Sequence, residues 1–488
     1  YSTVVADVLA RWHRMQGDAV HFVTGTDENA QKNAEVALKM QKAEGKMQNE
    51  REVVKRYVDE MSAKWQMTWK ELGFSHDDFI RTTEHRHIAA VNTFFKAVQE
   101  KGDIYKGKYV GYYCTGCEAY VTESDLVDGK CPLHKREPKK LEEENYFFRS
   151  SKYRDQLLAY IEKHPEFVQP ASRRHEVVNY IREHFNDFSI SRQSLHWGIP
   201  VPGDVSQSLY VWFDALINYL TTIGYGTNDA QFQKFWPADL HLVGKDIIKF
   251  HCALWPAMLL SAELPLPKVV FAHGFFTIDG QKISKSLGNA IDPVALTQKY
   301  SLDAVRYFLL REIPFGEDGD FSFARLEERY TSDLANGIGN LTARVITLAT
   351  KTGGNWKFEI GNSSLAEAAQ HTWATYERAI DEFRFHDALA ATWSFITACD
   401  EYLEQQKPWK PTEKSEKPEI VIAMLLESLR HIAWLLWPVM PTTAERIFSQ
   451  LGILEESKRQ SIEQAKQWGN VAFHVEKGPI LFPRLDNH

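Results

Sequence analysis

The chain has 488 residues, which is too long for one hydrophobic core and fits two or three domains. With 44% hydrophobic and 25% charged residues, and no apolar stretch near the roughly 20 residues of a membrane span, it excludes disordered, fibrous and membrane proteins. The net charge of −8 excludes a globally basic nucleic-acid binder but allows RNA contacts through local basic patches and aromatic stacking.

The first hundred residues alternate helical and strand-like segments. Apolar residues from Val4 to Trp12 repeat at helical spacing, residues 21–25 and 80–83 indicate short strands, and residues 89–99 indicate a helix. This alternation favours an α/β domain with a parallel sheet. The chain does not open with a signal peptide, so we expect a cytoplasmic protein.

Between residues 105 and 185 the sequence becomes aromatic, charged and cysteine-bearing, which indicates an insertion. The α/β rhythm returns at 208–220, 240–260 and 269–277, and from about Ser332 the pattern is helical almost to the end. The predicted architecture is α/β: a split nucleotide-binding fold, an inserted zinc module and a C-terminal helix bundle.

Two short motifs in the insertion have the spacing of metal knuckles. Cys114-Thr-Gly-Cys117 and Cys131-Pro-Leu-His134 each place two residues between candidate ligands. Four nitrogen and sulfur ligands close a tetrahedral Zn²⁺ site on all sides, which predicts a structural metal without an open position for water. The alternative is a set of unpaired buried cysteines.

A glycine-bearing loop with two lysines and two hydroxyls runs from Asp279 to Ser286. A lysine ammonium suits the charge that builds on a departing pyrophosphate, although an exposed Lys/Ser turn would have the same composition. The loop follows a strand-like segment, 269–274, and ligands in open α/β sheets bind at the carboxyl ends of strands. The position therefore favours a phosphate-binding role.

Two more predicted strands end in a carboxylate. The segment 240–246 ends in Gly244 and Asp246, where a carboxylate can accept hydrogen bonds from a ribose or cap a helix. Asp27 follows the early strand and could meet a ligand ammonium.

Two predicted helices carry aromatic stripes. One has Trp212, Ala215, Leu216 and Tyr219 and the other Ile247, His251 and Trp255, all at helical spacing. Such stripes are often ordinary core, but two of them beside predicted strand ends would suit a pocket for a flexible thioether.

In this order the motifs resemble a class I aminoacyl-tRNA synthetase, and most of all its methionyl branch. Lys282-Ile-Ser-Lys-Ser286 is similar to the signature loop Lys-Met-Ser-Lys-Ser of the class. The methionyl likeness rests on the segments Thr24-Gly-Thr-Asp-Glu28, Asp78-Phe-Ile-Arg-Thr-Thr83, Tyr109-Val-Gly-Tyr-Tyr-Cys114, Tyr210-Val-Trp-Phe-Asp-Ala215, Gly244-Lys-Asp-Ile247, Asp318-Gly-Asp-Phe-Ser322, Asp333-Leu-Ala-Asn336 and Gly339-Asn-Leu341.

The resemblance implies ATP-dependent activation of L-methionine to methionyl-adenylate and its transfer to tRNA(Met), with a structural Zn²⁺ and with Mg²⁺ accompanying ATP. The implied catalytic residues are Lys282, Ser284 and Lys285. The implied methionine-binding residues are Asp27, Trp212, Ala215, Tyr219, Ile247, His251 and Trp255. The implied ATP-binding residues are Gly244, Asp246, His273, Gly274 and Lys285. The implied anticodon-end residues are Asp400, Trp409 and Trp468.

The resemblance also implies five segments. They are the first half of a Rossmann-type catalytic domain (1–104), an insertion with zinc knuckles (105–185), the second catalytic half (186–288), a signature-loop and stem-contact region (289–345) and a helical anticodon-binding domain (346–488).

The sequence departs from the family pattern in three places. The family's His-Ile-Gly-His motif and the strand before it would precede Tyr1, so the resemblance implies impaired activity for the chain as written. Asn29 stands where the family usually has histidine. Asp400 stands where asparagine is common, although a carboxylate can still accept from the N4 amino group of cytosine. Because the sequence ends soon after Leu485, where the common core of the family ends, we expect a monomer.

Two rival hypotheses remain. A synthetase for a branched aliphatic amino acid would carry a larger editing insertion than residues 105–185 provide. A tRNA-binding protein on an inactive synthetase scaffold would lack methionine-dependent pyrophosphate exchange.

Overall fold

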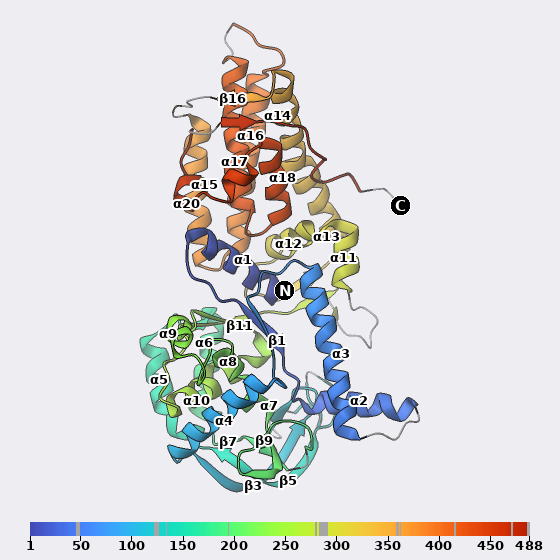
Figure 1. Cartoon of the computed structure of the whole chain (residues 1–488), viewed down its shortest axis with the longest axis vertical. Coiled ribbons are helices and arrows are strands. Elements are labelled where there is room, and N and C mark those ends of the chain that lie inside the picture. The colour runs from blue at the N-terminus through green and yellow to red at the C-terminus, as the bar shows by residue number, and fades with distance from the viewer. Residues whose placement is uncertain are drawn as a thin grey trace. The chain divides into compact units, whose positions relative to one another are not determined.

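The computed structural model describes residues 1–44, 49–121, 126–132, 134–193, 195–278, 281–282, 291–357, 361, 363–413, 416–469 and 472–485. The chain divides into two compact units (Figure 1). One consists of Tyr1–Val20 with His273–His488, and the other of His21–Ala272. The five segments expected from the sequence are finer than this division and stay predictions.

The unit His21–Ala272 contains the parallel strands predicted from the first hundred residues. Strand β1 (Val23–Thr26) pairs with β2 (Asp78–Arg81) in parallel, and each strand begins and ends within two residues of its predicted bounds. A Cβ at Gly25 would overlap the carbonyl oxygen of Ile80, so the close approach of the strands requires glycine there. Helix α4 (His85–Glu100) follows β2 and buries Phe94 and Phe95 in the core of the unit.

A second sheet of this unit has the order β11-β12-β6. Strands β11 (Leu240–Gly244) and β12 (Val269–His273) are the other two strands predicted to end near a ligand, and β12 pairs in parallel with β6 (Val168–Gln169). The parallel pairs confirm the α/β prediction for this unit.

The predicted insertion begins with a long antiparallel pair. Strand β3 (Ile104–Cys114) pairs with β5 (Lys139–Phe148) in a four-stranded sheet of order β4-β3-β5-β7. β3 ends at the first predicted metal ligand, so the sheet supplies the rigid base of that site.

The other elements of this unit, in chain order, are α2 (Gln31–Glu44), α3 (Glu50–Glu71), β4 (Ala119–Val121), α5 (Arg154–Lys163), α6 (Ala171–His184), β7 (Phe188–Ser189), β8 (Ser191–Arg192), β9 (Pro200–Val201), β10 (Asp204–Leu209), α7 (Val211–Ala215), α8 (Asn218–Thr221), α9 (Asp229–Phe235) and α10 (Trp255–Ser261).

The other unit is mainly helical, as predicted. Its long C-terminal helices run side by side in Figure 1. Helix α17 (Pro418–Leu436) contacts α14 (Asn340–Lys351), α15 (Ser364–Asp381), α16 (Phe385–Gln406) and α18 (Pro441–Leu451). Every residue from Val421 to Leu436 is buried, including Glu427, Arg430 and His431, so α17 is the central helix of the bundle. The buried charges pair with each other, because Arg430 Nη2 lies 2.7 Å from Glu427 Oε1.

The remaining elements of this unit are α1 (Ser2–Gln16), β13 (Phe276–Ile278), β14 (Gln281–Lys282), α11 (Pro293–Tyr300), α12 (Leu302–Arg311), β15 (Gly319–Phe321), α13 (Phe323–Arg329), a π-helix (Tyr330–Gly339), α14, β16 (Asn355–Lys357), α15, α16, α18, α19 (Leu454–Ser457), α20 (Ile462–Ala465) and β17 (Ala472–His474). Helix α1 confirms the predicted opening helix and buries Val4, Val8 and Trp12. None of the helices in the described part of the chain has the length and apolar character of a membrane span.

Candidate functional site

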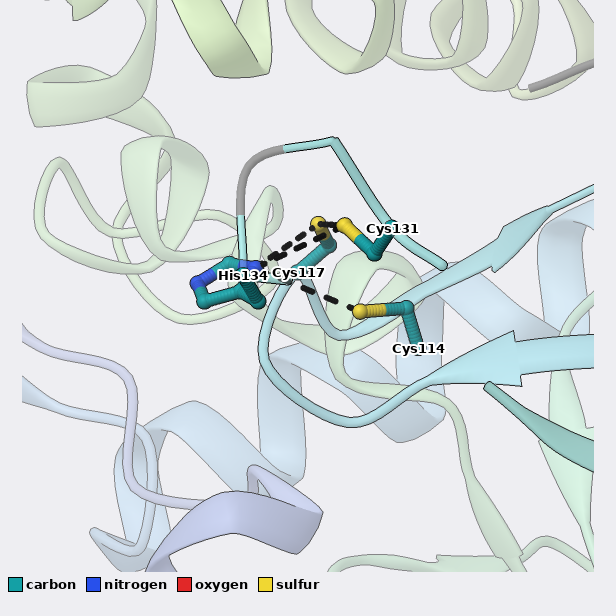
Figure 2. Close-up of side chains that lie close together, drawn as sticks. All are labelled: Cys114, Cys117, Cys131 and His134. Atoms are coloured by element: carbon teal, nitrogen blue, oxygen red, sulfur yellow. Dashed lines mark hydrogen bonds between the residues drawn. The ribbon is translucent and has the colours of Figure 1, made fainter. Parts of the chain in front are cut away.

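The four predicted metal ligands converge at the end of β3 (Figure 2). Cys114 lies at the end of the strand and Cys117 in the turn that follows, while Cys131 and His134 come from the loop before β5. Their ligand atoms all lie within 4.8 Å of one another. The fold therefore brings the two sequence motifs together.

The spacing of these atoms fits one tetrahedral metal ion. Cys117 Sγ lies 3.5 Å from Cys131 Sγ, and His134 Nδ1 lies 3.2 Å from Cys117 Sγ and 3.8 Å from Cys131 Sγ. A tetrahedral Zn²⁺ with ordinary bond lengths would hold its sulfur atoms about 3.8 Å apart and sulfur and nitrogen about 3.6 Å apart. A Cβ at Gly116 would lie 2.5 Å from the His134 ring, so this turn needs glycine.

His251 and Tyr219 form a hydrogen bond whose direction is fixed by a backbone carbonyl. His251 Nδ1 lies 3.1 Å from the Ile247 carbonyl oxygen, and because a carbonyl only accepts, Nδ1 carries the proton. Burial lowers the pKa of His251 to about 4, so the ring is neutral at pH 7. Nε2 therefore accepts from the Tyr219 hydroxyl at 2.8 Å.

A second buried histidine, which we did not predict, joins this pair. His241 on β11 stacks on the Tyr219 ring with centroids 4.1 Å apart, and its Nε2 accepts from Trp255 Nε1 at 3.2 Å. Burial lowers the pKa of His241 to about 3 and the neighbouring His251 contributes, so this ring is neutral as well. The only sequence signal was a histidine within the apolar strand Leu240-His-Leu-Val.

Trp212 completes an aromatic cluster with Tyr219, His241, His251 and Trp255. Its ring lies 6.2 Å from that of His251 in an edge-on arrangement and stacks on Phe250 at 4.2 Å. The buried Trp212 Nε1 has no acceptor among the described residues. A buried N–H without a partner is costly in a folded protein, so this donor is available to a ligand or water atom.

Residues of the two predicted stripes lie in contact, but neither stripe lies on one continuous α-helix as predicted. The first stripe is split between α7 and α8, with Leu216 and Ile217 between them. The second starts in a 3₁₀ turn (Lys245–Ile247), continues as a π-helix (Phe250–Leu254) and reaches regular α10 only at Trp255. Local hydrogen bonding such as the His251–Ile247 contact is invisible to a pattern of apolar spacing, and π-helical turns often mark functional sites.

Asp27 directly follows β1 and keeps its side chain exposed. The protein around the Asp27 carboxyl reduces its solvation and the charge of the neighbouring Glu28 repels it, and together they raise the pKa of Asp27 to about 6. Its charge also acts on Tyr219, whose pKa is raised by burial and then by Asp27, so the carboxylate lies near the aromatic cluster. Ala215 is buried at the end of α7, next to Asp214.

The residues after Asp27 connect β1 to α7. Glu28 is buried and accepts from Arg81 Nε at 2.8 Å and from the Thr83 hydroxyl. Asn29 Nδ2 donates to Asp214 Oδ2 at 2.9 Å. Burial raises the pKa of Asp214 well above its usual range, with a further contribution from Asp27. These buried polar residues hold the loop of Asp27 against the helix of Trp212, and sequence reasoning assigned them no role.

The predicted phosphate loop is anchored by a parallel strand pair. β13 pairs with β15, and Phe275 N donates to Asp318 Oδ1 at 2.8 Å. A Cβ at Gly274 would overlap the Glu317 carbonyl, so the backbone of this turn must be glycine. His273 is buried beside it, with Nε2 2.6 Å from the Ser2 hydroxyl and Nδ1 donating to the Gly274 carbonyl.

Of the residues predicted to contact phosphate in this loop, only Lys282 is among the described residues. The backbone of Lys282 pairs with Thr277 in the hairpin β13–β14. Ser284 and Lys285 fall outside the described residues. At the end of β11, Gly244 occupies the N-cap position of the 3₁₀ turn, and Asp246 is exposed within that turn. The alternative prediction, that Asp246 caps a helix, is therefore wrong.

In the helix bundle, a hollow of about 420 Å³ lies beside Trp409 and Arg344. The Arg344 guanidinium lies over the Trp409 ring at 5.5 Å and pairs with Glu404 and, at 3.8 Å, with Asp400. Burial raises the pKa of Asp400 to about 6, Arg344 opposing and Glu404 adding to the shift. Trp409 is 48% exposed, and Arg344 was missed by sequence reasoning.

Trp468 belongs to a different cluster of the bundle. Its ring stacks on His431 of α17 with centroids 5.2 Å apart, and its Nε1 has no partner among the described residues. Among the described residues, Trp468 shares no hydrogen bond or ring contact with Asp400 or Trp409.

Two family models match the chain. "tRNA synthetases class I (M)" matches residues 1–140 and 121–346, and "Anticodon-binding domain of tRNA ligase" matches residues 364–477. The first covers more than half of the chain.

Similar proteins match over its whole length. The methionine–tRNA ligase of Caldanaerobacter subterraneus subsp. tengcongensis is 44% identical over 503 residues, covering 100% of this chain and 76% of the relative. That of Thermotoga maritima is 44% identical over 500 residues, covering 100% and 77%. A crystal structure of the Mycobacterium tuberculosis methionyl-tRNA synthetase bound by methionyl-adenylate superposes with a TM-score of 0.91 at 35% identity, covering 99% of this chain and 96% of that one.

Proposed function

The chain belongs to the methionyl-tRNA synthetase family of class I, and from this premise we propose how its residues divide the work. The reaction is the ATP-dependent activation of L-methionine followed by transfer to tRNA. A methionine carboxylate oxygen attacks the α-phosphorus of ATP and pyrophosphate leaves; a terminal ribose hydroxyl of tRNA then attacks the carbonyl carbon and AMP leaves with the electrons of the broken bond.

The aromatic cluster is proposed to hold the methionine side chain, and the observation that carries this is the neutral Tyr219–His251 hydrogen bond. The hydroxyl proton of Tyr219 is committed to His251, so Tyr219 has no proton to donate to sulfur. The unpartnered N–H of Trp212 is then a candidate donor to the thioether, a weak acceptor that also favours aromatic edges. Trp255, Ile247 and Ala215 would complete the apolar lining.

Asp27 is proposed to bind the methionine ammonium. It lies at the end of a parallel strand, close enough to Tyr219 for its charge to act on the phenol. One end of the substrate is thus recognised by charge and the other by apolar and sulfur contacts.

The nucleotide end is proposed to involve Gly244 and Asp246 for adenosine, and His273, Gly274, Lys282, Ser284 and Lys285 for the phosphates, with Mg²⁺ accompanying ATP. Support comes from Gly244, Asp246, His273 and Gly274, which lie at or just after the ends of β11 and β12, where open α/β sheets bind ligands. An ammonium placed at the departing pyrophosphate would stabilise charge that develops in the transition state.

The experiment that tests the function is methionine-dependent pyrophosphate exchange in the full-length protein. We expect exchange with methionine and ATP, and a loss of about 10²–10³ in the single-turnover rate of adenylate formation for Lys285→Ala, with methionine affinity nearly unchanged. Absence of exchange in the full-length protein would favour the inactive-scaffold alternative. An unchanged rate in the variant would reduce the loop to a solvated turn.

The cysteine and histidine cluster is proposed to bind one structural Zn²⁺. When bound, the ion would crosslink the turn after β3 to the loop before β5 and supply no nucleophile, because protein fills all four positions. Elemental analysis should find about one zinc per chain, and Cys131→Ala should lower that content and the melting temperature together. Metal-free protein with an unchanged melting temperature would contradict the assignment.

The hollow at Arg344 and Trp409, with Asp400, is proposed to meet the anticodon end of tRNA. The exposed indole offers a stacking surface, and Arg344 and Asp400 offer a donor and an acceptor at its edge. Trp468 is proposed to support the helix bundle rather than to contact the anticodon, because its ring is stacked on His431.

A further inference from the structure

A cavity of about 330 Å³ opens beside Asp27 in the unit His21–Ala272, and its aromatic lining residues have none of the roles proposed above. Its volume is at the low end of the range of about 300–1,000 Å³ for small-molecule pockets. Its polar and aromatic lining residues include Asp27, Glu28, Asn33, Trp65, Trp69 and Phe79.

One wall of the cavity is aromatic. Trp65 and Trp69 lie one helical turn apart on α3, with ring centroids 4.9 Å apart, and Phe79 comes from β2. Trp69 Nε1 donates to the Thr24 hydroxyl at 3.2 Å, which fixes this ring against β1. Trp65 remains 42% exposed, although a large apolar ring is normally covered. The wall is thus a partly fixed stacking surface open to solvent.

The charges of the cavity disfavour a phosphate. Of the lining residues that the structure describes, none is basic, and two are carboxylates. Glu28 is neutralised by Arg81, which leaves Asp27 as the exposed charge. Asn33 Nδ2 donates to the backbone carbonyls of Asp27 and Glu28 at 3.2 Å, so its amide group is held at the rim. A neutral base with its sugar fits this environment better than a phosphate.

The reaction itself brings a nucleoside to this place. If Asp27 binds the methionine ammonium, the carbonyl carbon lies within about 5–6 Å of the carboxylate, two covalent bonds beyond the nitrogen. The attacking ribose hydroxyl must come within about 3–3.5 Å of that carbon. The terminal nucleoside of tRNA must therefore lie in a space adjoining Asp27.

We propose that this cavity receives the 3′-terminal nucleoside of tRNA, with its base against Trp65 and Trp69 and its ribose toward Asp27. The inference rests on the proposed role of Asp27. It adds a subsite that acts only in the transfer step, because adenylate formation does not involve tRNA.

The test is Trp65→Ala in the full-length enzyme, with Met67→Ala as the matched control. Met67 lies on the same helix, is 64% exposed and does not line the cavity. Stacking of one base on an aromatic side chain is typically worth about 1–3 kcal/mol, so kcat/KM for tRNA should fall about fivefold to a hundredfold in Trp65→Ala. Trp65→Phe should restore most of this loss, and Met67→Ala should match the unaltered enzyme.

Pyrophosphate exchange separates this proposal from the function on which it rests. Exchange that continues unchanged in Trp65→Ala, with a loss confined to the transfer step, supports the proposal. A raised KM for ATP in exchange would place the adenine of ATP in the cavity instead and overturn the proposal. Unchanged transfer kinetics in Trp65→Ala would overturn it as well.

A tRNA whose terminal nucleoside lacks its base identifies the stacked group. On this substrate Trp65→Ala and the unaltered enzyme should have the same kcat/KM, because the base that would stack on Trp65 is already absent. Equal losses from Trp65→Ala on intact and abasic tRNA would show that the indole contacts another part of the acceptor end, and would contradict the assignment.

Discussion

The aromatic cluster around His251 and the hollow around Arg344 are both built from aromatic rings and hydrogen-bonding side chains, but they handle charge in opposite ways. In the cluster the two histidines are buried, neutral and fixed in one tautomer. In the hollow a guanidinium lies over a half-exposed indole and between two carboxylates.

This difference matches the ligands proposed for each place. A thioether has no charge, so its recognition depends on shape, polarizability and the direction of a few buried hydrogen bonds, which salt does not screen. Nucleic acid carries charge, and its recognition at an exposed surface weakens as salt rises. The variants below test whether the two ends of the reaction can be disturbed separately.

The largest effect is expected from His251→Ala. It leaves the part-buried Tyr219 hydroxyl without its acceptor, at a typical cost of about 1–3 kcal/mol, so KM for methionine should rise about fivefold to a hundredfold. The preference for methionine over leucine should narrow, and KM for ATP should stay constant in pyrophosphate exchange. Tyr219→Phe combined with His251→Ala should cost less than the sum of the single changes. Additive losses would contradict a functional hydrogen bond.

A smaller effect is expected from pH. The pKa of Asp27 is raised to about 6, so the carboxylate is ionised above that pH and protonated below it. Methionine binding should thus be constant above pH 7 and weaken about tenfold per unit as pH falls below 6. The histidines of the cluster, with pKa values of about 4 and 3, stay neutral in this window. Asp27→Asn should bind weakly at every pH. A variant that kept the pH dependence would exclude Asp27 as its source.

The smallest effect is expected from Arg344→Gln. At moderate salt the affinity for tRNA should fall only a few-fold, because the guanidinium is partly exposed and already paired with Glu404 and Asp400. If Arg344 contacts a phosphate, the slope of log affinity against log salt should decrease by about one. KM for methionine should show no salt dependence in either protein. A salt-dependent methionine KM would break the comparison between the two regions.

The sequence predicted those features that depend on the spacing of residues close together in the chain. The two knuckles predicted four converging ligands because each motif fixes its own pair, and the strands before Asp27 and Asp246 were located from short apolar runs. The two aromatic stripes were expected to line one pocket, and the hydrogen bond between His251 and Tyr219 shows that residues of the two stripes lie together.

Features that depend on long-range burial were missed. Nothing local distinguishes His241 from a surface histidine in a strand, and its pairing with Trp255 depends on how β11 packs against the π-helical turn. The bond between Asn29 and Asp214 joins residues 185 positions apart. Helix continuity was also overestimated, since apolar spacing does not report the break between α7 and α8 or the carbonyl that His251 engages.

The complete burial of α17 has a consequence for biosynthesis. From Val421 to Leu436 every side chain needs a covering neighbour, and part of that cover comes from α18, which lies after α17 in the chain. During translation α17 leaves the ribosome after α14, α15 and α16 but before α18, so the part of its apolar surface that α18 covers stays exposed until later residues arrive. The bundle can therefore be completed only after α18 has been synthesised, and until then the surface of α17 that α18 covers is a place where the nascent chain can aggregate or bind chaperones.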